Sequence, residues 1–248
     1  MTQLAAKTDV IRQLQKEVLS LQGFKPLADI QSFGAGLGTI ERSFPGGIFP
    51  TGTVHELISH TEEDSAATNG FIAGLLGKLM LRRKSCVWIS TKRTIFPPVL
   101  KLFGIEPSQV MFIDVARQSD ALWAIEEALK CNALAAVIGE IREVNFTESR
   151  RLQLAVEKSK VTGFIHRTNP KSENTVACVT RWKIRQLSSV LDAGMPGVGY
   201  PRWSVQLLKV RNGRPGTWHI EWSGGDFQHI AMHAISIPDI QIQTRKTG

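Results

Sequence analysis

Long apolar runs are missing from this 248-residue chain, and its first residues do not have the pattern expected of a secretory leader. A membrane-spanning helix needs about 18 or more consecutive apolar residues, and no stretch of the sequence reaches that length. The N-terminus, MTQLAAKTDVIRQLQKEV, carries charges at helical spacing where a signal peptide requires an apolar segment. We therefore expect a cytoplasmic protein without a membrane partner.

Cysteine is scarce and scattered. Cys86, Cys131 and Cys178 lie far apart and form neither a CxxC pair nor a Cys/His cluster, which argues against a disulfide framework and a zinc site. We expect all three to be small buried hydrophobic residues. His229 and His233 are spaced as helical neighbours but have no third ligand nearby, so we expect no metal site there.

Internal repeats and low-complexity segments are also absent, and apolar residues make up 42% of the chain. This composition is enough for one sizeable core. We expect three parts: an amphipathic N-terminal helix over residues 1–25, an α/β domain over residues 26–226, and a C-terminal tail over residues 227–248 with partial order.

The positive charge is unevenly distributed. Through Arg150 the chain has 16 Lys and Arg against 16 Asp and Glu, whereas from Arg151 onward it has 14 against 6. The second part therefore carries the whole net charge of +8. Such a basic segment favours acidic partners such as nucleic acid, and a merely solvated surface explains it equally well.

Strand-like and helix-like patterns alternate from Thr53 onward. Periodicity predicts strands at Thr53–Ser59, Cys86–Ser90, Gln109–Asp114, Ala133–Gly139 and Thr162–His166, and helices at Asn69–Arg82, Phe96–Phe103, Asp120–Cys131 and from an N-cap at Thr147 to Ser159. This alternation predicts a mostly parallel sheet covered by helices on both faces. Further strands at Val176–Leu187, Trp203–Arg211 and Thr217–Trp222 follow without helices between them, which predicts antiparallel strands at the C-terminal side.

The segment Pro45 to Leu76 has the layout of a phosphate-binding loop: a Gly-Gly turn, a strand, a connection and a helix. A working loop needs glycines around the phosphates, a lysine, and a hydroxyl for magnesium. The predicted connection, HTEEDSAATN, contains neither glycine nor lysine and has three carboxylates where phosphate would bind. It is therefore a degenerate nucleotide loop, in which we single out His60, Asp64, Thr68 and Asn69.

Two further nucleotide-handling positions are also altered. The strand ALAAVIG should end in an aspartate that organises magnesium, but it ends in Gly139 followed by Glu140, which we expect to be an ordinary solvated carboxylate. The strand CVWIS should end in a glutamate that activates water, but Ser90 is followed by a threonine and two cations. We therefore expect no catalytic residue, no cofactor and no enzymatic activity.

The segments PGGIFPTGTVHEL, SDALWAIEEALKCNALAAVIGEI and TESRRLQLAVEKSKVTGFIHR together resemble RecA, and more closely the ImuA branch of its superfamily, which is related to the SulA cell-division inhibitors. WSVQLLKVRNGRPGTWHIEW is similar to the strand-turn-strand that closes the RecA core. The resemblance runs from about Phe44 to Trp222 and implies a RecA-like fold.

The resemblance also implies a function. ImuA-like proteins belong to an inducible mutagenesis cassette and associate with ImuB, an inactive relative of Y-family polymerases, and with an error-prone replicative-type polymerase. We therefore expect an accessory subunit of translesion synthesis in the SOS response, with DNA or RecA as further contacts. The rivals are a SulA-like inhibitor that binds the division protein FtsZ, and a RecA-like ATPase with an unorthodox loop.

Basic residues alternate with apolar ones in the C-terminal strands, so the cations share one face. The candidate nucleic-acid-binding residues are Arg181, Lys183, Arg185, Arg202, Lys209, Arg211 and Arg214. A solvated sheet face is the alternative. Nearby Trp203, Trp218 and Trp222 would either stack on bases or, more commonly, fill the core under the sheet.

Overall fold

The structure is a computed structural model that describes residue 14 and residues 34–82, 85–190 and 199–230. Its strands are β1 (Val54–Ser59), β2 (Cys86–Ser90), β3 (Val110–Asp114), β4 (Ala136–Ile141), β5 (Thr162–Thr168), β6 (Thr180–Leu187), β7 (Arg202–Val210), β8 (Gly216–Ser223) and β9 (Asp226–His229). Its helices are α2 (Glu62–Leu79), α3 (Gln118–Leu129) and α4 (Phe146–Ser159), with short 3-10 helices η1 (Gly38–Ser43), η2 (Pro45–Gly47), η3 (Met80–Arg82), η4 (Pro97–Phe103) and η5 (Pro107–Gln109). The predicted N-terminal helix lies outside the described residues, apart from Leu14.

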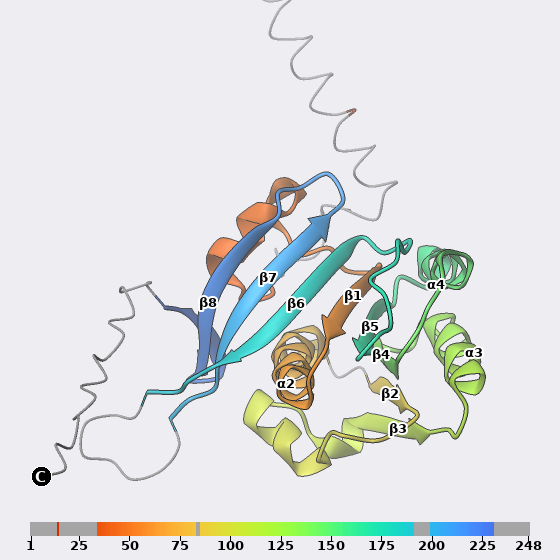
Figure 1. The fold of residues 1–248 in the computed structure, drawn as a ribbon, viewed down its shortest axis with the longest axis horizontal. Helices are drawn as coiled ribbons and strands as arrows, with labels where there is room; N and C mark the ends of the chain where they lie inside the picture. Colours follow the sequence, from red (N-terminus) through yellow and green to blue (C-terminus); the bar gives the residue numbers. More distant parts are fainter. Residues whose placement is uncertain (1–13, 15–33, 83–84, 191–198, 231–248) are drawn as a thin grey trace, which may run out of the picture.

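All described strands belong to one nine-stranded sheet in the order β3-β2-β4-β5-β1-β6-β7-β8-β9 (Figure 1). The strands from β3 to β6 run parallel, and β6 to β9 run antiparallel. The inner parallel strands β1, β2, β4 and β5 are almost entirely buried because helices cover both faces, whereas β3 at the sheet edge is partly exposed. The predicted mostly parallel α/β fold with antiparallel strands at its C-terminal side is confirmed.

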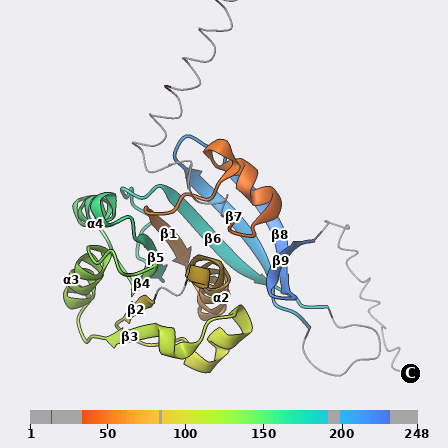
Figure 2. The same ribbon diagram turned by 180° about the vertical axis from the view of Figure 1, so that it is seen from behind.

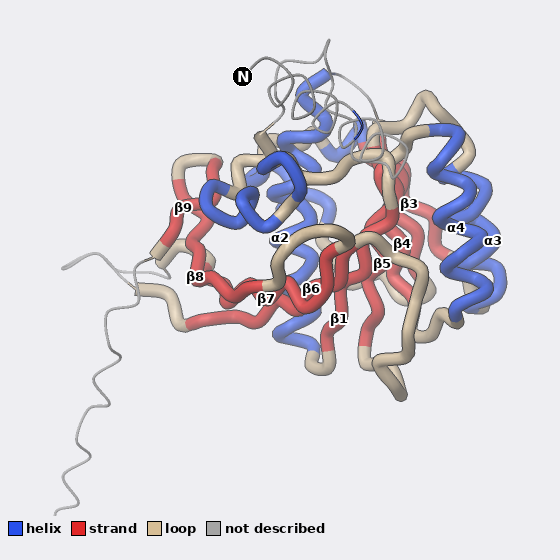
Figure 3. The backbone as a smooth tube through the Cα atoms, turned by 90° about the horizontal axis from the view of Figure 1, so that it is seen from above, coloured by secondary structure: helices blue, strands red, loops and turns tan. Residues whose placement is uncertain are grey.

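Two hydrophobic clusters lie on opposite faces of the sheet. On one face α2, η1 and η4 pack over residues such as Leu57, Trp88 and Trp182. On the other face α3 and α4 cover their strand neighbours, including Ile89 and Val137. Figure 3 shows α3 and α4 side by side at the end of the sheet away from β8 and β9. Of the described α-helices, α2 alone follows the strand in the middle of the sheet, β1.

The antiparallel strands continue the sheet beyond β6, and the 3-10 helix η1 packs against β8 and β9 (Figure 2). Trp203 and Trp222 are buried beneath these strands, and Trp218 packs against the same cluster. The more common of the two roles considered for these tryptophans, filling the core, is therefore the one observed.

Three local predictions were wrong. The tail was expected to begin at residue 227, but Phe227 is buried in β9 and packs against Trp203 and Trp222, so the domain continues to His229. The cap of α4 is Asn145, whose side chain accepts the backbone N–H of Glu148, and Thr147 lies inside the first turn. Cys131 is exposed because α3 has already ended before it.

Candidate functional site

The connection between β1 and α2 lies at the carboxyl end of the parallel strands, where α/β proteins bind ligands. It consists of His60 and Thr61 alone. Thr61 is the N-cap of α2, and its hydroxyl accepts the backbone N–H of Asp64 at 3.1 Å. The first turn of the helix then carries Glu62, Glu63 and Asp64. Carboxylates at this position are stabilised by the helix dipole, and they occupy the place of a bound phosphate.

The predicted ten-residue loop is therefore wrong, because the helix starts seven residues before Asn69. Of the four residues singled out there, His60 remains in the connection and its Nε2 lies 2.9 Å from Glu173 Oε1. Asp64 lies in the first turn, and Thr68 is buried and donates to the Asp64 carbonyl at 2.7 Å. Two backbone N–H groups at this helix start are bonded within the chain, that of Asp64 to the Thr61 hydroxyl and that of Ser65 to the Thr61 carbonyl.

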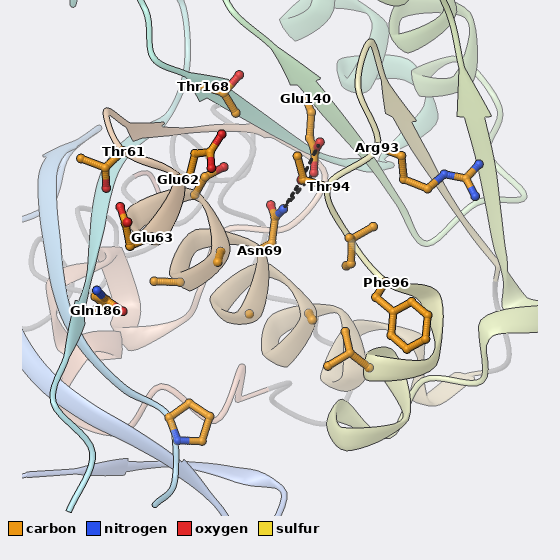
Figure 4. Close-up of a pocket in the computed structure, with 18 of the residues that line it drawn as sticks. Thr61, Glu62, Glu63, Asn69, Arg93, Thr94, Phe96, Glu140, Thr168 and Gln186 are labelled. Carbon is orange, nitrogen blue, oxygen red and sulfur yellow. Dashed lines mark hydrogen bonds between the residues drawn. The ribbon is translucent and has the colours of Figure 1, made fainter. Parts of the chain in front are cut away.

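Asn69 and Glu140 form the centre of a buried network. Glu140 Oε1 accepts from Asn69 Nδ2 at 3.0 Å and from Trp88 Nε1 at 2.9 Å, and Oε2 accepts from Thr94 Oγ1 at 3.4 Å (Figure 4). The Glu140 residue is only 4% exposed, so the prediction of a solvated carboxylate is wrong. Burial raises its pKa above the usual value, and these three hydrogen bonds oppose the change.

His166 extends this network to β1. Because Asn69 uses its amide N–H groups on Glu140, its Oδ1 accepts from His166 Nδ1 at 2.8 Å. The other ring nitrogen, Nε2, then accepts from the Ser59 hydroxyl. Burial lowers the pKa of His166 from its usual value to about 3, so the ring is neutral. The network thus links the ends of β1, β2, β4 and β5 to α2.

These residues do not fit the magnesium–nucleotide complex that a RecA-like fold implies. The Glu140 carboxylate is surrounded by three donors, and the carboxylates of Glu62 and Glu63 repel phosphate at the helix start. The described part of the chain contains no group of three or more His, Cys, Asp or Glu side chains that could hold a metal ion.

A cleft of about 980 Å³ lies over the N-terminal half of α2. Figure 4 shows Glu62, Glu63 and Gln186 on one side of it and Phe96 on the other. Its floor contains small residues of α2, and its apolar walls come from η4 and from the start of β7. Phe96 and Leu102 line it with 70% and 67% of their surface exposed. The sequence predicted the degenerate loop, but it did not predict this cleft.

Several of the predicted nucleic-acid-binding residues are held by carboxylates. Arg181 contacts the fully buried Glu56, Lys183 Nζ lies 3.7 Å from Glu173, and Arg202 Nε lies 2.6 Å from Glu221. These pairs neutralise part of the positive charge on the strands.

The other candidates are more open. Arg185 and Arg214 are exposed, Arg211 is half-buried, and Lys209 Nζ donates to the Val176 carbonyl at 3.3 Å. Arg181 lies opposite Lys209 across β6 and β7, next to a register shift between Arg181 and Trp182. Nucleic-acid binding by these residues stays a prediction.

Residues that sequence reasoning missed include Glu56 and Arg167, which form a fully buried ion pair at 2.9 Å between β1 and β5. The sequence pattern placed His166 only at the end of a predicted strand. The sequence did contain a signal for His166 and Arg167 of β5, because each is a polar residue next to an apolar run, and buried polar side chains require partners. The partners themselves come from other strands.

The strand order, the antiparallel extension and the two-residue connection define a RecA-like domain without a phosphate loop between β1 and α2. A solved structure of the RadB recombinase is similar to it, with a TM-score of 0.56 and 13% identity, over 80% of this chain and 100% of that chain. At 13% identity this likeness shows a shared fold and nothing more.

Sequence comparison identifies the family. The chain is 31% identical over 211 residues to the protein ImuA of Caulobacter vibrioides in two strains, NA1000 / CB15N and ATCC 19089 / CB 15, covering 80% of this chain and 86% of the relative. The chain therefore belongs to the ImuA family, which confirms the resemblance. No model of a protein family matches the sequence. Within the described residues, no helix is long and apolar enough to cross a bilayer.

Proposed function

We propose that this chain is a non-catalytic accessory subunit of an inducible translesion DNA synthesis complex. The observation that carries the proposal is the start of α2, where Thr61 caps the helix and Glu62 and Glu63 occupy the phosphate position. A RecA-like domain altered in this way retains its surfaces for binding partners while the nucleotide chemistry is replaced. Membership of the ImuA family supports a role in damage-induced mutagenesis.

The expected partners are an ImuB-like Y-family polymerase homologue and an error-prone replicative-type polymerase. The basic residues of β6 and β7 face away from α2 because the intervening Trp182 and Ile184 pack into its cluster. DNA or a RecA filament would contact this outer face, on the opposite side of the sheet from the cleft.

Damage-induced mutation frequency tests the proposal. A strain lacking only this gene is compared with its parent after equal ultraviolet doses, and we expect it to lose most induced mutations. Expression of the intact gene from a plasmid should restore them. An unchanged mutation frequency would contradict the proposal, and abnormal cell length on overproduction would then support the FtsZ-binding alternative.

An ATPase function makes the opposite prediction for Glu140. If the protein hydrolysed ATP through an unorthodox loop, turnover by the purified protein would be measurable and would disappear in Glu140→Ala. We expect no turnover above a buffer control in either form, because the carboxylate is committed to Asn69, Trp88 and Thr94.

A further inference from the structure

The cleft over α2 combines an apolar surface with an acidic end. Leu102 and Phe96 of the η4 segment expose most of their surface on one wall, and Trp203 forms part of the other. Exposed large apolar side chains that rim a concave surface are typical of protein-binding sites. A small ligand would leave most of these two side chains in water.

The floor of the cleft allows another chain to approach α2 closely. Ala66, Gly70 and Ala73 lie on one face of the helix and line the cleft. A Cβ atom at Gly70 would lie 2.9 Å from the Trp203 ring, so this glycine lets the wall residue pack against the helix. The floor therefore contributes little side-chain volume along the length of the cleft.

The charges restrict the chemistry of the occupant. Glu62 and Glu63 stand exposed at one end of the cleft, and the pKa of Glu63 is held below its usual value by its own backbone N–H and by Thr61. Two cations line the cleft elsewhere: Arg93 at the opposite rim is bound to Asp114, with Nη2 2.6 Å from Oδ2, and Lys92 beside it is exposed. The acidic character is therefore confined to the helix start. Anions are repelled from the helix start, and a cation is attracted to it.

We propose that this cleft is a receptor for a peptide segment of a partner protein, whose aromatic or leucine side chain packs against Phe96 and Leu102 and whose lysine or arginine pairs with Glu62 and Glu63. The proposal rests on the proposed function, since it assigns the partner-binding site of the accessory subunit.

Panning a phage-displayed library of random peptides, each about 12 residues long, on the full chain tests the proposal. We expect the selected peptides to combine an aromatic or leucine residue with a lysine or arginine. Affinities of synthetic copies for protein variants are then measured by fluorescence anisotropy. Ala66→Trp fills the cleft from an exposed position, and we expect it to weaken binding at least about tenfold, as we do for Leu102→Ala.

Two further variants separate charge from shape. Glu63→Gln removes the charge at nearly constant volume, so it should weaken binding and reduce its dependence on salt. Trp123→Ala is the matched control, since Trp123 is 66% exposed on α3, away from the cleft, and its loss should leave affinity unchanged. Circular dichroism of each variant checks that the fold is retained.

The proposal is overturned if panning yields no peptide that Ala66→Trp blocks, if the selected peptides are acidic, or if Trp123→Ala abolishes binding while the cleft variants do not. In cells, a mutagenesis defect on deletion that Ala66→Trp fully repairs would reject the cleft as the partner site and leave the proposed function standing. Normal mutagenesis on deletion, with peptide binding lost in Ala66→Trp, would reject the proposed function and leave the cleft standing.

Discussion

Glu140 lies near the strand end where a magnesium-organising aspartate was sought, and here its buried side chain has a structural role. Its carboxylate joins α2 to β2 through Asn69 and Trp88, and it lies beside the strand β5 that carries His166. A buried carboxylate is costly unless donors surround it, and here donors come from three different elements. Glu140 therefore orients the carboxyl ends of the parallel strands relative to α2.

Replacing Glu140 separates hydrogen bonding from charge. Glu140→Ala leaves the Trp88 and Asn69 donors unsatisfied in the interior, and we expect it to lower the free energy of unfolding by roughly 2–4 kcal/mol. Glu140→Gln keeps an acceptor for both donors and removes a buried carboxyl group, so its loss should be about 1 kcal/mol or less. Urea unfolding at pH 7 measures both. Equal losses for the two variants would contradict this role.

The start of α2 is the element that distinguishes this molecule from a nucleotide-binding relative of its fold. Thr61 supplies the acceptor for a free backbone N–H, and three acidic residues follow in the first turn. Helix α4 begins in a similar way, with Asn145 as its cap and Glu148 completing a capping box. In both cases a side chain of the cap residue accepts a backbone N–H group that the first turn would otherwise leave free.

Substitution of the caps tests this account. We expect Thr61→Ala and Asn145→Ala each to lower the free energy of unfolding by about 1 kcal/mol, because each leaves a backbone donor unpaired. Thr147→Ala is the control, since Thr147 is exposed inside the first turn of α4 and alanine has the higher helix propensity. Thermal and urea unfolding of the three variants give the comparison. If Thr147→Ala lowers the free energy of unfolding as much as Asn145→Ala does, Thr147 rather than Asn145 is the N-cap of α4.

The whole molecule is held by one sheet whose central strands bury polar side chains as well as apolar ones. His55 on β1 stacks between Phe49 and Phe164, and its ring nitrogens lie 2.7 Å from Thr180 Oγ1 and 2.8 Å from the Pro50 carbonyl. Burial lowers the pKa of His55 to about 3, which its hydrogen bond to Pro50 only partly opposes. Together with His166, it places two neutral histidines within adjacent strands.

This arrangement makes stability depend on pH. Because the pKa values of His55 and His166 are lowered in the folded chain, the unfolded chain binds more protons below about pH 6.5. Their contribution is fully present above the unfolded value of 6.5 and is lost as the pH falls toward about 3. By pH 5 we expect a loss of roughly 2 kcal/mol for each histidine.

Urea unfolding between pH 7.5 and pH 5 measures this dependence. The raised pKa of Glu140 acts in the opposite direction, so the decisive comparison is with His55→Gln, in which about half of the histidine contribution should disappear. A slope that is the same in the variant and in the original protein would show that His55 is not buried neutral.

The sequence predicted β1 and β2 to within one residue, because fully buried strands read as short apolar runs between turns. Strand β4 starts later than predicted and continues past the predicted end at Gly139, so that it contains Glu140. The sequence also predicted that glycine, lysine and the two catalytic carboxylates are absent from the nucleotide-handling positions. The start of α2 was missed because Glu62, Glu63 and Asp64 were interpreted as a polar loop, although Thr61 followed by an acid three residues later is a helix-start pattern.

The amino-acid sequence by itself determined the alternation of strands and helices, the family, and the loss of the phosphate loop, since each depends on residue types at short spacing. Only the tertiary structure decided that Glu140 is buried and that η4, α2 and β7 enclose a cleft. Those features join residues such as Asn69 and Glu140, or Phe96 and Trp203, that are far apart in the chain. Their meeting depends on strand order and on helix packing across the sheet, which local patterns do not encode.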